Sequence, residues 1–276
     1  MRWRSFSVVA FDCDSTLSSV EGIDVLAAEL GMEADVAKLT DSAMNGDRDL
    51  SDVYGARLEL LNPSRTQVMA LKSAYKRTAV PHAKATVEAL IASDVDTWIV
   101  SGGLVEPVRE FGVWLGVEPS HVQAVGVEFD PLAGEWWSEG PDETKYLEYR
   151  AGHLTATTGK GDVLDRSIKR RGRRLMVGDG MSDAAVGSSV DMFVAFAGVV
   201  DRPQVTKLAP VVIRSASLAP LLALALGPSE TVRLLDTSHR QVALAALEAI
   251  DDGALEFNDA ALGRSFAAAL SISRGS

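Results

Sequence analysis

Two aspartates separated by one residue, Asp12 and Asp14, directly follow a short apolar run near the start of the chain. Extended backbone directs the side chains of residues i and i+2 to the same side, so the two carboxylates share one region and Cys13 points away, into packing. Two carboxylates this close do not both ionise cheaply unless a cation lies between them. The pair fits a nucleophile with an acid-base partner, or a metal site; alone, a D-x-D is as often a capped turn.

A second acidic motif, GDGMSD at 178–183, contributes Asp179 and Asp183. Its glycines permit tight turns and close approach of a ligand, and carboxylate oxygens are the hard ligands that Mg²⁺ prefers. A lone GDG is commonly a solvated turn. Four carboxylates gathered at one place would repel one another without a divalent cation, so the two motifs together favour a metal site.

Two further segments offer positive or donor groups for an anion. The tripeptide SGG at 101–103 lies between a predicted strand and a predicted helix, where free amides and a hydroxyl favour anions. Lys160, in TGKG, precedes another predicted helix. It is not part of a P-loop, because Leu154 replaces the first glycine and Gly161 replaces the Ser or Thr. The alternatives are an ordinary loop and a solvated lysine.

Short apolar runs that end in these polar residues predict buried strands. They alternate with helical patterns, which predicts an α/β fold with a mostly parallel sheet, and such sheets bind ligands outside the carboxyl ends of their strands. The predicted strands are 6–11, 97–101, 175–179 and 192–196, and the predicted helices between them are 83–93, 104–115, 160–171 and 181–188.

The rest of the chain divides into three further parts. Residues 20–80 show helical spacing only, with helices expected at 36–44, 50–61 and 64–76, the last capped by Ser64. The segment 128–139 predicts a hairpin. We therefore expect a core of residues 1–17 and 81–226, a helical cap of residues 18–80, and a helical C-terminal extension of residues 227–276, which forms a homodimer contact or covers an apolar patch.

Composition limits the classes of partner. The 276 residues carry a formal net charge of −11 with a pI near 4.9, which disfavours a broad nucleic-acid footprint or an anionic membrane surface. The longest apolar run, 218–226, is far shorter than a membrane span, and the N-terminus lacks the apolar core of a signal peptide. Since Cys13 is the only cysteine, no intramolecular disulfide forms, and we expect a reducing, cytoplasmic setting.

The motifs FDCDST, VSGG, TGKG and GDGMSD, in this order and at strand ends, resemble the haloacid-dehalogenase superfamily over residues 6–226. Within it, EGID at 21–24, AMNG at 43–46 and Arg57 are similar to the phosphoserine phosphatase-like branch. The resemblance implies a Rossmann-like parallel-sheet core with a small helical cap inserted after the first strand. The segment from Gly227 has no recognised counterpart.

The resemblance also implies a Mg²⁺-dependent phosphomonoesterase that acts through a phospho-aspartate on a small phosphorylated metabolite. The substrate that it most strongly implies is O-phospho-L-serine. Asp12 would be the nucleophile and Asp14 the acid-base group. Mg²⁺ would be held by Asp12, Asp179 and the backbone carbonyl of Asp14, with Asp183 acting through water or by orienting the site. The phosphate would be bound by Ser101, Gly102 and Lys160, and the rest of the substrate by Glu21, Arg57, Met44 and Ser182.

Some residues depart from the branch pattern, and other functions stay open. Ser182 replaces a common Asn, and Leu50 stands where a close relative places an aromatic residue over the substrate. Glu21 and Arg57 also have plain interpretations, as a helix N-terminal acid and a surface charge.

The alternative functions are a phosphatase or phosphotransferase for another small metabolite and, more remotely, a non-catalytic phospho-acceptor protein.

Overall fold

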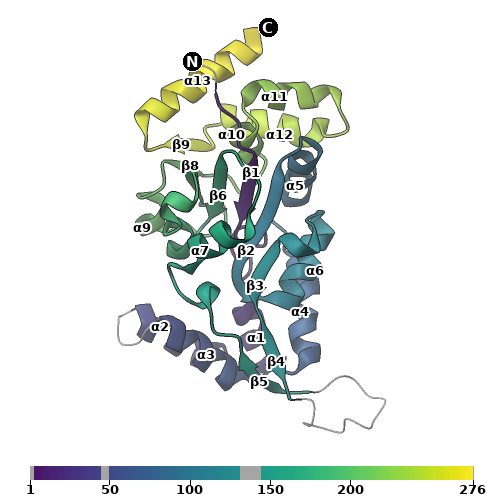
Figure 1. Cartoon of the computed structure of the whole chain (residues 1–276), viewed down its shortest axis with the longest axis vertical. Coiled ribbons are helices and arrows are strands. Elements are labelled where there is room, and N and C mark those ends of the chain that lie inside the picture. Colours follow the sequence, from purple (N-terminus) through teal and green to yellow (C-terminus); the bar gives the residue numbers. More distant parts are fainter. Residues whose placement is uncertain (1–2, 45–49, 131–143, 276) are drawn as a thin grey trace.

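A seven-stranded sheet in the order β3-β2-β1-β6-β7-β8-β9 forms the centre of the computed structural model, which describes residues 3–44, 50–130 and 144–275 (Figure 1). Every neighbouring pair from β3 to β8 is parallel, and only β9 runs antiparallel. The α/β prediction is therefore confirmed. The strands are β1 (Val8–Phe11), β2 (Asp96–Leu104), β3 (Val122–Val125), β6 (Arg174–Gly178), β7 (Met192–Phe196), β8 (Val211–Ile213) and β9 (Leu255–Phe257).

The central strands are apolar throughout because both faces of the sheet are covered. All four residues of β1 are buried, and they alternate between two hydrophobic clusters. Val9 and Phe11 belong to one cluster, and Val8 and Ala10 to the other. This continuous apolar character is typical of strands buried on both faces, and it explains why the runs could be found in the sequence.

Helices follow the strands as predicted, with different ends. The core helices are α5 (Ala83–Ala92), α6 (Val105–Leu115), α7 (Gly159–Ser167), α8 (Met181–Ala184), α9 (Pro203–Thr206) and α10 (Leu221–Ala225), and short 3₁₀ turns are η1 (Pro119–His121), η2 (His153–Thr155) and η3 (Gly187–Ser189). The predictions for 160–171 and 181–188 were too long: Ile168 has extended backbone, and a 3₁₀ turn follows α8. Strand β2 continues to Leu104 rather than ending at Ser101.

Four helices, α1 (Gly22–Leu30), α2 (Glu33–Met44), α3 (Leu50–Leu61) and α4 (Arg65–Arg77), lie between β1 and α5 and gather at one end of the molecule (Figure 1). Ser64 caps α4 as predicted, because its side chain accepts a hydrogen bond from the Gln67 N–H. The Gln67 side chain in turn accepts one from the Ser64 N–H. At the same end, β4 (Val127–Phe129) pairs antiparallel with β5 (Tyr146–Tyr149). Most of the hairpin predicted at 128–139 lies outside the described residues.

The C-terminal segment lies at the opposite end and contains α11 (Pro228–Arg233), η4 (Leu234–Asp236), α12 (Arg240–Asp251), β9 and α13 (Ala260–Gly275) (Figure 1). Only helices were predicted here, but β9 adds an edge strand to the core sheet next to β8. The Phe266 ring meets that of Trp3 edge-on at 5.1 Å, which joins α13 to the N-terminal segment. Within the described ranges, no helix is long and apolar enough to cross a membrane.

Candidate active site

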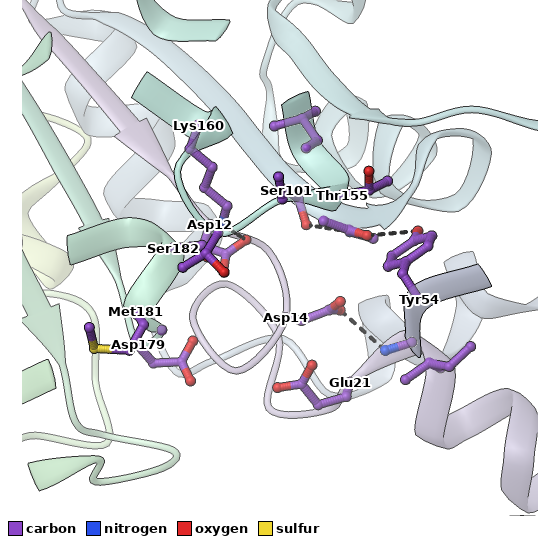
Figure 2. Close-up of a pocket in the computed structure, with 18 of the residues that line it drawn as sticks. Asp12, Asp14, Glu21, Tyr54, Ser101, Thr155, Lys160, Asp179, Met181 and Ser182 are labelled. Carbon is purple, nitrogen blue, oxygen red and sulfur yellow. Dashed lines mark hydrogen bonds and ion pairs between the residues drawn. The ribbon is translucent and has the colours of Figure 1, made fainter. Parts of the chain in front are cut away.

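The carboxyl ends of β1, β2 and β6 open into a cavity of about 380 Å³, which the cap helices α1, α3 and α4 also line. Figure 2 shows Lys160, Asp12 and Asp179 on one side of this cavity and Asp14, Glu21 and Tyr54 on the other. The lining residues include nearly all of the predicted site residues: Asp12, Asp14, Glu21, Arg57, Ser101, Gly102, Lys160, Asp179 and Ser182. Asp183 lies directly behind this lining, bonded to Lys160.

The Lys160 ammonium lies between two buried carboxylates. Its Nζ is 2.9 Å from Asp12 Oδ1 and 2.7 Å from Asp183 Oδ1, and the side chain is only 3% exposed. Lys160 belongs to the first turn of α7, which begins at Gly159, one residue before the predicted start. Burial disfavours its charge, but the two carboxylates outweigh burial and raise the pKa of Lys160, which therefore stays protonated.

Three buried aspartates could hold a metal ion. One carboxylate oxygen from each of Asp12, Asp179 and Asp183 lies within 4.8 Å of the others. Burial, followed by the Asp12 charge, raises the pKa of Asp179, and the same two causes raise that of Asp183 to about 8, against the opposing ammonium of Lys160. A cluster of hard oxygen donors with this unfavourable charge fits a small divalent cation such as Mg²⁺.

Asp14 has a different environment from Asp12. Burial, then the charges of Glu21 and Asp12, raise its pKa well above the ordinary value. Its Oδ1 accepts a 3.3 Å hydrogen bond from the Gly22 N–H (Figure 2). A Cβ at Gly22 would lie 2.3 Å from the hydroxyl oxygen of Tyr75, so glycine is needed for this close packing around Asp14. A carboxyl that keeps its proton can act as an acid.

The SGG segment forms the last part of β2, where the pairing with β3 becomes irregular. Ser101 is fully buried, and its Oγ accepts a 3.0 Å hydrogen bond from the Gly103 N–H. The bond uses the hydroxyl as an acceptor, so the hydroxyl hydrogen can point to another acceptor. A side chain at Gly103 would come within 3.3 Å of Asp14 Oδ2, which explains why glycine follows here.

The cap side of the cavity carries the predicted substrate selectors. Glu21 Oε1 accepts a 2.8 Å hydrogen bond from Ser15, and burial raises the pKa of Glu21. The Arg57 Nε is buried and, among the described residues, has no hydrogen-bond partner. Arg57 lines the cavity, and a guanidinium with a nitrogen that has no partner suits an anionic ligand group. Met44 ends α2, but its side chain lies outside what the structure describes.

Arg202 and Tyr54 are among the lining residues that sequence reasoning missed. Arg202 Nε donates to Asp179 Oδ2 at 2.9 Å, and its Nη2 is 3.6 Å from Glu21 Oε1. Arg202 follows β7 at the edge of the sheet that holds the site, so the strand-end rule could have found it. Tyr54 carries no such signal, because its place depends on how α3 lies over the core.

Comparisons with known proteins agree with this geometry. A scan against models of protein families finds no match. The chain is 33% identical to phosphoserine phosphatase of Rattus norvegicus over 204 residues, which cover 73% of this chain and 86% of that protein. It is 32% identical to the phosphoserine phosphatase of Homo sapiens, with the same coverage.

Solved structures share the fold. A phosphoserine phosphohydrolase-like protein from Francisella tularensis superposes with a TM-score of 0.65 at 22% identity, covering 78% of this chain and 99% of that one. A phospho-aspartyl intermediate analogue of phosphoserine phosphatase gives 0.61 at 24% identity, covering 79% and 98%.

The curated relatives identify the chain as a phosphoric monoester hydrolase of the haloacid-dehalogenase superfamily, and the parallel sheet, the acidic strand ends and the buried lysine agree with that class. The chain belongs to the phosphoserine phosphatase-like branch of that superfamily.

Proposed function

We propose that this protein hydrolyses O-phospho-L-serine to L-serine and phosphate, with Mg²⁺ and a phospho-aspartate formed on Asp12. The observation that carries the proposal is that two carboxyl groups of one cavity have different electrostatic environments. Asp12 is ion-paired to Lys160, whereas Asp14 has a raised pKa. A carboxylate paired with an ammonium, next to a carboxyl that keeps its proton, fits a nucleophile beside a general acid.

Asp12 attacks the phosphorus in this proposal. Its contacts within the described residues, with Lys160 Nζ and with the Cys13 N–H, both use Oδ1. We therefore assign Oδ2 as the attacking oxygen. A P–O bond forms between Oδ2 and phosphorus while the ester P–O bond breaks, and the electron pair of that bond leaves with the serine oxygen.

Asp14 completes both half-reactions. It donates its proton to the departing serine oxygen, and as a carboxylate it then removes a proton from the water that attacks the phospho-aspartate. That second step releases phosphate, restores the Asp12 carboxylate and returns the proton to Asp14. The raised pKa of Asp14 supports its role in the first step.

The transferring oxygens are held by Ser101, the Gly102 amide and Lys160, which supply donors for a group that is negative throughout. A bound Mg²⁺ would neutralise phosphoryl charge as a Lewis acid, and Asp12, Asp179, the Asp14 carbonyl and Asp183 would hold it. The donor set described above fits this ion.

Recognition of the serine part rests on the cap side of the cavity. Arg57 would bind the carboxylate with its planar guanidinium, and the Nε without a partner supports this role. Glu21 would bind the ammonium group. Ser182 lines the same cavity and would contact the substrate from the core side.

Phosphate release from a panel of phosphorylated metabolites, with and without Mg²⁺, tests the proposal. We expect O-phospho-L-serine to be the best substrate and chelation to abolish turnover. Rapid turnover of another metabolite with phosphoserine ignored would overturn the substrate assignment and leave the phosphatase class intact. A panel that includes acceptor alcohols separates hydrolysis from phosphotransfer.

A further inference from the structure

Tyr54, on the cap helix α3, lines the cavity but has no part in the mechanism proposed above. Its hydroxyl donates a 2.9 Å hydrogen bond to the Gly102 carbonyl, which lies 48 residues further along the chain (Figure 2). Burial, then the Asp14 charge, raises the pKa of Tyr54, so the hydroxyl keeps its proton and acts as a donor. The bond connects the cap directly to the SGG segment of β2, which is assigned to phosphate binding.

The peptide unit between Gly102 and Gly103 in this segment is held by a hydrogen bond at each end. The Gly102 carbonyl accepts from Tyr54, and the Gly103 N–H of the same planar unit donates to Ser101 Oγ. A peptide between two glycines rotates with little steric resistance, so it needs such bonds to keep one orientation. Its orientation in turn fixes the Ser101 hydroxyl, whose hydrogen is then free to donate to a phosphoryl oxygen.

The Tyr54 ring is fixed by its own neighbours. The ring centroid lies 5.3 Å from that of Tyr149 on β5, and the Arg57 guanidinium carbon lies 5.9 Å from the ring of Tyr54. Gly55 permits this packing, since a Cβ there would approach the Tyr149 ring at 2.8 Å. Tyr54 also lies one helical turn after Leu50, where the branch pattern has an aromatic residue, and it supplies an aromatic wall to the cavity.

We propose that Tyr54 is a positioning residue that couples the packing of cap helix α3 to the phosphate-binding SGG segment, by holding the Gly102–Gly103 peptide in the orientation that aims the Ser101 hydroxyl at the phosphoryl group. The bond forms only when α3 lies over the end of β2. The proposal deepens the function proposed above and rests on it for the identity of the substrate, but its effect is on phosphate, which every phosphomonoester carries.

Tyr54→Phe removes one oxygen and keeps the ring. We expect the inhibition constant of inorganic phosphate, and the KM of both phosphoserine and p-nitrophenyl phosphate, to rise by about three- to tenfold, the loss of one buried hydrogen bond. The thermal midpoint should stay close to that of the wild type. Tyr54→Leu, which also removes the aromatic wall beside Arg57, should add a loss that is specific to phosphoserine.

Tyr146→Phe is the matched control, because Tyr146 is a half-buried tyrosine of β5 that does not line the cavity. It should leave all three constants unchanged. A Tyr54→Phe variant with wild-type phosphate inhibition, or with an effect on phosphoserine alone, would overturn the proposal. If the wild type ignores phosphoserine, the phosphate and p-nitrophenyl phosphate measurements still decide the role of Tyr54, so the two failures are distinguishable.

Discussion

The core side and the cap side of the cavity differ in how completely their charges are paired. On the core side, Lys160 and Asp183 are 3% and 0% exposed and are bonded to each other. On the cap side, Arg57 and Glu21 are only partly buried, and the Arg57 Nε has no partner among the described residues. Lys160 and Asp183, assigned to phosphoryl transfer, are thus held in place by each other, whereas Arg57, assigned to recognition, keeps a donor without a partner.

The largest effect should come from the core side. Asp12→Asn keeps the shape of the side chain and removes the nucleophile, so kcat should fall by at least about 10³-fold. Phosphate release measures the loss, and circular dichroism checks that the fold is retained. Activity within tenfold of the wild type would show that another residue attacks the phosphorus.

Removing Lys160 should cost stability as well as activity. Lys160→Met leaves Asp12 and Asp183 buried without their cation, and breaking a buried pair in this way costs about 3–5 kcal/mol. Urea unfolding in chelator measures the change in the free energy of unfolding. Lys38→Met is the control, because that lysine is 76% exposed and its pairing with Asp35 contributes little.

Replacement of the cap arginine should separate recognition from chemistry. Arg57→Ala should raise the KM for phosphoserine by about 10- to 100-fold, since a charged hydrogen-bond partner is lost, and leave p-nitrophenyl phosphate turnover close to the wild type. Steady-state kinetics with both substrates test this. Arg77→Ala, an exposed cap arginine away from the cavity, should change neither. Equal losses on both substrates would contradict the division into two sides.

The smallest effect should appear in the pH dependence of the metal-free protein. Folded Asp183 has a pKa of about 8, against roughly 3.9 in an unfolded chain, so between these values the folded state binds more protons. The stability it contributes is complete below about pH 4 and is lost as the pH rises through 8. We expect Tm in chelator to fall as the pH rises from 6 to 8 and to level off near pH 9, above the folded pKa.

Mg²⁺ provides the control for that experiment. A cation that neutralises the three aspartates should raise Tm and flatten its pH dependence. Asp183→Asn should also reduce the fall. A metal-free Tm that rises with pH would show that the raised pKa is wrong.

The core was predictable because its strands carry their own signals. The runs at 6–11 and 192–196 are buried on both faces, and the first ends in polar residues, so these strands and the site at the end of β1 follow from the sequence. Strands β8 and β9 were missed because each has three residues, too few to show a period. β9 also depends on pairing with an edge that the local sequence does not reveal.

The cap side was less predictable for a related reason. Glu21 and Arg57 could be named from the family pattern, but the hydrogen bond from Tyr54 to Gly102 joins segments whose approach no local pattern encodes. The ion pair of Arg202 with Asp179 is likewise a product of tertiary packing. Chain-local motifs indicate the chemistry, and the contacts that tune it require the fold.

Trapping of the phosphorylated enzyme tests the central claim most directly. The protein is mixed with Mg²⁺ and O-phospho-L-serine, quenched in acid within the first turnovers, and digested for peptide mass spectrometry. We predict one added phosphoryl group, on Asp12, that is absent from Asp12→Asn. Phosphoserine turnover with the phosphoryl group on another residue, or with none trapped at any time, would contradict the account.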